Sequence, residues 1–437
     1  MKPKPFLGWS MITLLALAPV LMLLLFGPRG SNIYDYSSFT HFIGQSAGLI
    51  GMTLLVISFI LSTRWKLIER IFGGLDKVYN VHHIVGVLSL IFIFMHPIFL
   101  VLKFVPADWY RAATYLLPGG LVSVDLGIYA LLGLIILIAL SVYFSIRYDY
   151  WKISHKFMGA VFILAALHIL LVRGTASRDY IFTGYYAYAA IVSIIGFICF
   201  IYTLLIKSEI VNHKYRINAV KMPCNGVYEI SMTPVNEQIH YKAGQFVFLK
   251  FHSSKLSGES HPFSIASSSD SAKLKVIVKG LGDFTDKMGE LSAGEYADVE
   301  GPYGNFNFEQ YYDKDQIWIA GGIGVTPFIG MAKDIMFKQK LDYNIHLYYS
   351  VKDASEFVCI DDFLEAQSKT KGFRVIAWVD KEKGFLNADI IMKYSGNLPG
   401  KEFFICGPKA MKSSIKKQLL ARGVPISDIH MEDFDFR

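Results

Sequence analysis

The chain has 437 residues, of which 53% are hydrophobic and only 18% are charged, and its mean hydropathy is +0.38. This composition excludes a single soluble globule and indicates that a large part of the chain lies in a membrane. The formal net charge is +7. Because the basic residues lie largely in loops between apolar segments, this charge does not indicate a nucleic-acid partner.

Six apolar runs are close to the roughly 20 residues that an α-helix needs to cross a bilayer. They are 7–26, 42–61, 83–102, 124–144, 157–172 and 185–206. FGPRGSNIYDY follows the first run without a small-residue cleavage site, so we expect a retained helix or signal anchor. Ten Lys and Arg residues lie on the side of both termini and five on the other. The positive-inside rule therefore predicts a multi-pass protein of the cell membrane with a cytoplasmic polar half.

Two of the apolar segments carry a histidine near each end. HHIVGVLSLIFIFMH contains His82 and His96, and HKFMGAVFILAALH contains His155 and His168. The first pair is 14 residues apart, which in an ideal helix is about 21 Å of rise and within about 40° of one face. The second pair is 13 residues apart and about 140° out of line. Helix tilt, local winding or rotated cofactor planes must absorb that offset.

These rings suit the axial ligands of two b-type haems, stacked as an inner tier of His82 with His155 and an outer tier of His96 with His168. His83 is the alternative to His82. We prefer His82 because HHIVG and HKFMG then align, each with a glycine that lets a flat cofactor approach the backbone. The competing interpretation is that the rings make interhelical hydrogen bonds or relay protons. Matched tiers on two helices favour haem.

The part of the chain from residue 207 onward mixes polar and apolar residues and is long enough for two domains. The cysteines show no paired spacing, which argues against a disulfide framework, an iron–sulfur cluster or a zinc site. They are Cys199, Cys224, Cys359 and Cys406.

A flavin motif begins this polar part. YKAGQFVFLKF at 241–251 predicts a strand, and HPFSIASSS follows from His261. In it Phe263 can lie against a flavin ring and Ser264 can hydrogen-bond its edge, although HPFS alone also suits a buried strand. VEGPYG at 299–304 closes the domain with a turn.

KVIVKGLGDFTDKM lies between these two segments. Here Lys279, Gly282 and Thr285 can surround a pyrophosphate through charge, close backbone approach and hydroxyl donation. Because the segments occur in this order and spacing, a flavin site explains them better than three unrelated strands and loops.

A nucleotide motif follows in QIWIAGGIGVTPFIGMAKDIM. A strand at 316–320 leads into a glycine-rich turn, and a helix begins near Thr326 and Pro327. Such a helix N-terminus binds anions, so a dinucleotide pyrophosphate is the expected guest, although the motif is not GxGxxG.

Two further predicted strands, at 344–353 and 401–411, end at the same kind of site. Ligands gather at the carboxyl ends of strands in open α/β sheets. Cys406 and Gly407 would then lie beside the nicotinamide, or Cys406 is simply a small buried residue.

The order HPFS, GDFT, GPYG, GGIGVTPF, CGPKAM and a terminal aromatic, behind six helices with paired histidines, resembles the ferric reductase and NADPH oxidase superfamily, especially its bacterial NADPH oxidase homologues. The resemblance covers nearly the whole chain. It implies a multidomain membrane protein: an all-α six-helix haem domain at 1–207, a ferredoxin-reductase-like FAD-binding β-barrel at 208–308 and an NAD(P)-binding α/β domain at 309–437.

The resemblance also implies site residues. FAD would be held by His261, Pro262, Phe263, Ser264, Gly282 and Thr285, and covered by the tail aromatic Phe434 in preference to Phe436, although the tail runs past Phe434. The nicotinamide nucleotide would be held by Gly321, Gly322, Gly324, Thr326, Pro327, Cys406, Gly407 and Pro408.

The choice between NADPH and NADH rests on the end of the strand at Tyr349. Ser350 and Lys352 suit a 2′-phosphate, whereas NADH sites usually present an acid to the ribose. Asp353 is an acid close to the same site and favours NADH. On the strength of Ser350 and Lys352, NADPH is the expectation, and NADH is the alternative.

The expected function is electron transfer from cytosolic NADPH through FAD and two haems to an external acceptor, with no catalytic residues beyond the cofactors. Bis-histidine ligation leaves the outer iron no open position, so oxygen would be reduced to superoxide at the haem edge. A ferric chelate is the alternative acceptor, but the predicted outer loops lack a carboxylate cluster for hard metal ions. A non-catalytic haem-binding or proton-conducting module is the alternative of another class. The sequence does not show whether the protein has partner subunits.

Overall fold

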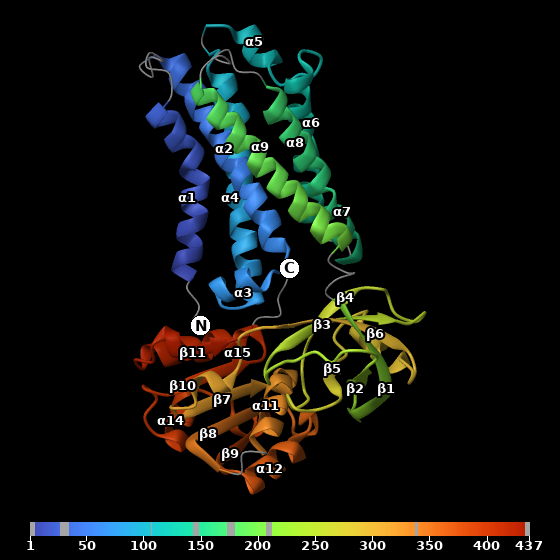
Figure 1. Ribbon diagram of the computed structural model, residues 1–437. Coiled ribbons are helices and arrows are strands. Elements are labelled where there is room, and N and C mark those ends of the chain that lie inside the picture. Colours follow the sequence, from blue (N-terminus) through green and yellow to red (C-terminus); the bar gives the residue numbers. More distant parts are fainter. Residues whose placement is uncertain are drawn as a thin grey trace. The chain divides into compact units, whose positions relative to one another are not determined.

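The computed structural model describes residues 5–26, 35–105, 107–142, 148–172, 180–206, 212–336 and 340–432. The chain divides into two compact units, Met1–Ile210 and Val211–Arg437. The first unit contains the apolar segments and the second contains the flavin and nucleotide motifs (Figure 1).

The first unit is a bundle of helices (Figure 1). Its described helices are α1 (Pro5–Phe26), α2 (Tyr36–Ser62), α3 (Lys66–Phe72), α4 (Leu75–Leu102), α5 (Trp109–Thr114), α6 (Val122–Val142), α7 (Tyr148–Lys156), α8 (Met158–Leu171) and α9 (Tyr180–Ile201), which continues into a π-helical turn, η1 (Tyr202–Ile206). Six segments of these helices are long and apolar enough to cross a membrane, and the fifth of them combines α7 and α8. The prediction of a multi-pass protein with six spanning helices is confirmed.

Helices α2 and α4 begin well before their predicted apolar runs. Asp35 caps α2, because its carboxylate accepts the backbone N–H of Ser38 at 2.9 Å. The cap stabilises a polar first turn, so the helix starts before the apolar run. The two helices then pack closely. A Cβ on Gly44, Gly48 or Gly51 of α2 would lie 2.7–3.0 Å from side chains of α4. Small residues along one face therefore set this helix pair.

The second unit begins with an antiparallel barrel. Its strands are β1 (Asn212–Cys224), β2 (Val227–Pro234), β3 (Phe246–His252), β4 (Ser260–Ser264), β5 (Leu274–Lys279) and β6 (Tyr296–Tyr303), in the order β4-β3-β6-β1-β2-β5. An isolated bridge between Ile265 and Val276 joins the two ends of this order. A short 3-10 helix, η2 (Thr285–Glu290), follows β5.

The unit continues as a parallel α/β domain. Its strands are β7 (Gln316–Gly321), β8 (Lys340–Val351), β9 (Lys371–Val379), β10 (Glu402–Cys406) and β11 (Ile429–Met431), in the order β11-β10-β7-β8-β9. Its longer helices are α11 (Thr326–Met336), α12 (Ile360–Lys369), α14 (Ala388–Ser395) and α15 (Lys409–Ala421), with short turns η3 (Phe308–Tyr311), η4 (Gly322–Val325), η5 (Ala354–Glu356), α13 (Asp380–Lys383) and η6 (Ile426–Asp428).

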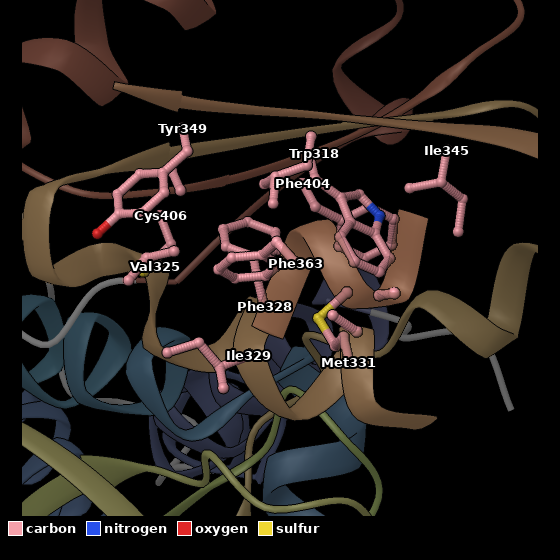
Figure 2. Close-up of a cluster of buried hydrophobic side chains, with 14 of the residues drawn as sticks. Trp318, Val325, Phe328, Ile329, Met331, Ile345, Tyr349, Phe363, Phe404 and Cys406 are labelled. Atoms are coloured by element: carbon pink, nitrogen blue, oxygen red, sulfur yellow. The ribbon is translucent and has the colours of Figure 1, made fainter. Parts of the chain in front are cut away.

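Two hydrophobic clusters cover the two faces of this sheet. One joins β7 and β8 to α11 and α12 and is shown in Figure 2, and the other joins the sheet to α14 and α15. All residues of β7 are buried, as expected for a central parallel strand. The chain runs outward from β7 to β9 and then returns to place β10 on the other side of β7. The carboxyl ends of β7 and β10 therefore form a topological switch point, where such sheets bind ligands.

Candidate functional site

The four predicted histidines meet in two pairs in the helical unit. The ring centroids of His82 on α4 and His155 on α7 lie 6.3 Å apart. Those of His96 on α4 and His168 on α8 lie 6.1 Å apart. In both pairs the ring planes are inclined at 69°. His83 is exposed, whereas His82 is half-buried and meets the partner ring.

Three of these rings are oriented by backbone carbonyls of neighbouring helices. Nδ1 of His96 lies 2.8 Å from the carbonyl oxygen of Gly44, and Nδ1 of His168 lies 2.6 Å from that of Ser123. Nδ1 of His82 lies 3.0 Å from the carbonyl oxygen of Ser58. A carbonyl can only accept, so Nδ1 of His96 and of His168 carries the proton and Nε2 keeps its lone pair. Metal-ligating histidines have this arrangement. Nδ1 of His82 also lies 3.0 Å from the Ser58 hydroxyl, which can donate as well as accept.

The fourth ring is held differently. The indole of Trp151, one turn earlier on α7, stacks on His155 with centroids 5.2 Å apart and planes inclined at 17°. The inner pair therefore combines one hydrogen-bonded ring with one stacked ring, and the outer pair has two hydrogen-bonded rings.

The distances between the paired rings fit an iron between them. Two metal–nitrogen bonds of about 2 Å in line, plus roughly 1 Å from each nitrogen to its ring centre, give about 6 Å between centroids. A Cβ on Gly86, one turn after His82, would meet no atom within 4 Å, so there is room beside the helix for a flat group. Gly159 does not share this property. A Cβ there would lie 2.1 Å from the ring of Phe200, so this glycine serves helix packing and its predicted role beside a cofactor is wrong.

The predicted angular offset between His155 and His168 is reduced by local winding. The helix is interrupted at Phe157, where α7 ends and α8 begins. Phe157 N donates to Ser154 O at 3.0 Å, and Ala160 N donates to Phe157 O at 2.9 Å, both in the tighter 3-10 pattern. Each residue wound in this way adds about 20° of rotation relative to an α-helix. The chain therefore turns further between the two histidines than an ideal helix would.

In the barrel, the HPFS motif forms strand β4. Phe263 is 8% exposed and packs in the barrel core, with its ring centroid 6.4 Å from that of Phe251. It thus presents no open ring face of the kind expected for contact with a flavin. Pro262 and Ser264 point to the other face of the strand and pair with Phe248 and Phe246 of β3.

His261 is held by two residues that the sequence motifs did not single out. Its imidazole stacks on Phe284 with centroids 3.9 Å apart, and its Nε2 lies 3.0 Å from a carboxylate oxygen of Glu259. These contacts fix the ring at the start of β4. Phe284 belongs to the GDFT motif, but the sequence does not show that it meets His261, because a strand separates the two residues.

The GLGDFT loop is closed by its own threonine. The Thr285 hydroxyl accepts the N–H of Leu281 at 2.9 Å and donates to the carbonyl oxygen of Gly282 at 3.3 Å. Gly282 is exposed, and a Cβ there would meet no atom within 4 Å. The loop therefore has room for a ligand, but the predicted donation by Thr285 is already used within the loop.

Lys279 lies at the border between the barrel and the nucleotide domain. Its Nζ is 3.7 Å from a carboxylate oxygen of Glu356 in η5. Both side chains line a cavity of about 210 Å³. The other residues of its wall are Cys224, Asn225, Val227, Gly322, Ile323, Ser355 and Val358. The cavity thus reaches from the flavin loop to the glycine-rich turn.

The glycine-rich turn packs directly against the turn after β10. A Cβ on Gly324 would lie 2.6 Å from the carbonyl oxygen of Cys406 and from Gly407, and a Cβ on Gly407 would lie 3.0 Å from Gly321. Gly322 has a φ of +53°. These glycines are therefore needed for the close approach of two backbones at the switch point. Cys406 is 3% exposed and belongs to the cluster in Figure 2.

Helix α11 begins at this turn as predicted. Pro327 occupies its first turn, and the Thr326 hydroxyl donates to the carbonyl oxygen of Ile323 at 2.7 Å. Pro408 is the N-cap residue of α15, at the turn after β10, and it lies against Gly321. Two helices therefore begin at the carboxyl ends of adjacent strands, which supplies amides for an anion.

The end of β8 lies beside a carboxylate that the sequence motifs did not indicate. Ser350 donates its hydroxyl to Asp380 at 2.7 Å, because β8 and β9 end side by side. Lys352 is exposed. Asp353 pairs instead with Lys381 at 2.9 Å, and this ammonium and the Ser355 groups lower the pKa of Asp353 to about 2. The end of β8 thus lies near two lysines, Lys352 and Lys381, which suit a phosphate, and near a carboxylate, Asp380, which suits a ribose.

The predicted flavin cover, Phe434, lies outside the described residues. Among the residues that the structure does describe, no group of three or more His, Cys, Asp or Glu could hold a metal ion, and all four cysteines are free.

Comparison with known families divides the chain into three parts. Residues 47–166 match the model of a ferric reductase like transmembrane component, residues 212–321 an FAD-binding domain, and residues 318–417 an oxidoreductase NAD-binding domain.

Individual relatives match only part of the chain. A component of the Na(+)-translocating NADH-quinone reductase of Pseudoalteromonas atlantica is 26% identical over 35% of this chain and 40% of its own length. The phenol hydroxylase P5 protein of Acinetobacter pittii is 25% identical over 46% of this chain and 59% of its own. The chain thus spans roughly half the length of these curated relatives.

Among solved structures, the flavohemoglobin from Malassezia yamatoensis is similar in fold, with 15% identity and a TM-score of 0.50 over 91% of this chain and 97% of the other. Residues 212–321 and 318–417 thus match domains that bind FAD and NAD. A ferric-reductase-like membrane domain, an FAD-binding domain and an NAD-binding domain, in this order along one chain, give it the architecture of the ferric reductases and NADPH oxidases.

Proposed function

We propose that this protein transfers electrons from cytosolic NADPH, through FAD and two b-type haems, across the membrane to oxygen, giving superoxide. The observation that carries the proposal is the pair of imidazole tiers, with ring centroids 6.3 and 6.1 Å apart and Nδ1 fixed on backbone carbonyls in three of the four rings. When bound, the flavin accepts a hydride and the haem irons pass on single electrons.

The residues of this chain would hold and orient these groups. His82 and His155 would ligate the inner haem, and His96 and His168 the outer one. With two imidazoles of the chain holding each iron, the haems would supply single-electron transfer and would offer the acceptor no protein-free position on the metal. This arrangement would suit a small diffusible oxidant such as oxygen.

In the nucleotide domain, the amides at the start of α11 and the turn of Cys406 to Pro408 would hold the dinucleotide at the switch point. NADPH is the proposed donor because Ser350 and Lys352 suit a 2′-phosphate. NADH is the competing donor, favoured by Asp380 on the Ser350 hydroxyl and by the relative whose name describes it as an NADH-quinone reductase.

A second candidate acceptor is a ferric chelate, which the match of residues 47–166 to a ferric reductase like component favours. The purified full-length protein, supplied with haem, FAD and NADPH, separates the two. Reduction of cytochrome c that superoxide dismutase abolishes supports the oxidase. Fe(III) reduction that superoxide dismutase leaves unchanged supports the reductase. A preparation without haem absorbance after growth with ample porphyrin would refute both.

A further inference from the structure

The serine-rich segment after HPFS makes a buried joint with the first helix of the nucleotide domain. Asp334 lies on α11 and is 8% exposed. Its carboxylate accepts the hydroxyl of Ser268 at 2.7 Å, and the N–H and hydroxyl of Ser269 at 2.8 and 2.9 Å. Burial raises the pKa of Asp334, and the three donors oppose this rise.

The barrel side of the joint is itself fixed. The Tyr241 hydroxyl donates to the carbonyl oxygen of Ser268 at 2.6 Å and lies 2.7 Å from the Ser267 hydroxyl, which also accepts the N–H of Lys275 at 3.1 Å. Burial raises the pKa of Tyr241 to about 12, so this phenol remains a donor throughout the physiological range. The serine segment is thus tied both to β5 and to the stretch of chain before β3.

The helix side lies equally close. A Cβ on Gly330 of α11 would lie 2.9 Å from the carbonyl oxygen of Ile265 and 3.0 Å from that of Ser267. The helix backbone therefore rests directly on the segment that follows β4. One end of this segment is Ser264, the predicted flavin contact, and α11 begins at Thr326 in the nucleotide turn.

We propose that Asp334 is a positioning residue for hydride transfer: it sets the position of the nicotinamide site relative to the flavin site by pinning α11 to the Ser268–Ser269 turn. The inference rests on the proposed reduction of FAD by a pyridine nucleotide. In that step a hydride, carrying two electrons, leaves the nicotinamide and joins the flavin, and NAD(P)+ is released. Because a displacement of about 1 Å between reacting groups costs as much as 100-fold in rate, loosening the pin slows the transfer without removing either binding site.

The test uses the full-length protein with FAD bound, mixed anaerobically with NADPH or NADH in a stopped-flow spectrophotometer. In Asp334→Ala we expect the limiting rate of flavin bleaching to fall at least tenfold. The nucleotide Kd and the FAD content should stay within twofold of the wild type. A nicotinamide deuterated at the transferred position should show a larger isotope effect, because transfer itself becomes limiting.

Four further variants keep the outcome clear. Ser269→Ala removes one of the three hydrogen bonds to Asp334 and should slow bleaching several-fold, and its combination with Asp334→Ala should add little, since both break one joint. Asp334→Glu, which keeps the carboxylate, should recover part of the rate. Asp362→Asn breaks the 2.9 Å ion pair to Lys333 on the same helix, without changing the joint to the barrel, and should bleach at the wild-type rate.

Wild-type bleaching rates in both Asp334→Ala and Ser269→Ala would overturn the positioning role while leaving the proposed function intact. A loss explained entirely by weaker nucleotide or FAD binding would overturn it as well. If the wild-type flavin is reduced by neither nucleotide, the proposed function fails and the positioning role fails with it.

Discussion

Gly127→Ala tests the outer tier without changing a histidine. A Cβ at this position of α6 would lie 2.7 Å from Nδ1 of His168, whereas ordinary contacts begin at 3.4 Å. The ring must therefore move by about 0.7 Å, which lengthens and weakens its 2.6 Å hydrogen bond to the carbonyl oxygen of Ser123 and displaces the imidazole from its partner ring. Loss of such an outer partner typically weakens metal binding 10- to 100-fold, the equivalent of about 1.4–2.7 kcal/mol. The outer haem should be lost or become easily extractable, and the inner haem should remain.

The assay is the haem content per polypeptide, with a redox titration of the reduced-minus-oxidised spectrum of the purified variant. Gly133→Ala is the matched control on the same helix, because its Cβ would lie 3.0 Å from a methyl group of Val161 and near no histidine. The control should keep both haems. A Gly127→Ala protein with two haems and unchanged midpoint potentials would show that His168 does not ligate iron in the position described.

Three further outcomes are expected. His82→Ala should remove the inner haem and His83→Ala should keep both, as counted by haem per polypeptide; the opposite result would exchange the two assignments. Glu356→Gln removes the carboxylate 3.7 Å from Lys279 and frees this ammonium for a pyrophosphate, so the FAD Kd measured by titration should fall about two- to fivefold, as for an exposed ion pair, and an unchanged Kd would mean that Lys279 does not bind the flavin pyrophosphate. Burial raises the pKa of Glu402, but hydrogen bonds from an imidazole and an ammonium outweigh it and bring the pKa below the usual 4.5. Its stabilisation is therefore fully present above about pH 4.5 and is lost as the pH falls through the folded-state pKa. The unfolding temperature of Glu402→Gln should thus lie below the wild type at pH 7, and the gap should narrow continuously as the pH falls below 4.5; a gap that stays constant through this acid range would contradict the reasoning.

Those features that depend on local pattern could be predicted from the sequence. The spanning helices follow from runs of apolar residues, and the glycine-rich turn with Thr326 and Pro327 follows from a strand, glycines and a first-turn proline in succession. The apolar run predicted that α2 begins at residue 42, but the helix begins at Tyr36. A hydropathy pattern does not detect a polar turn that is helical because it is capped.

Two of the missed residues, Asp380 and Asp334, act across long stretches of chain. Asp380 meets Ser350 because two parallel strands end together, and Asp334 meets Ser269 because a helix lies on a loop of another domain. Phe263 was expected to contact a flavin because an aromatic stands beside hydroxyls in HPFS, and this contact stays a prediction. Which strand face an aromatic occupies depends on the register with β3, and that register places Phe263 in the core.

The hydrogen-bond partners of the outer histidines were missed for another reason: every residue offers a carbonyl, so sequence alone cannot show which one accepts. The structure nevertheless reveals a local signal. The accepting residue is followed four positions later by a glycine in both outer cases, Gly48 after Gly44 and Gly127 after Ser123. A helical carbonyl points toward the side chain one turn ahead, and a Cβ there would lie 2.7 Å from Nδ1 of the incoming imidazole. In these two cases the glycine leaves space for the ring to reach a carbonyl already engaged in the helix, whereas His82 reaches the Ser58 carbonyl with Ser62 four positions later. A glycine facing an intramembrane histidine is therefore a sequence feature that can indicate a ligand ring held by backbone.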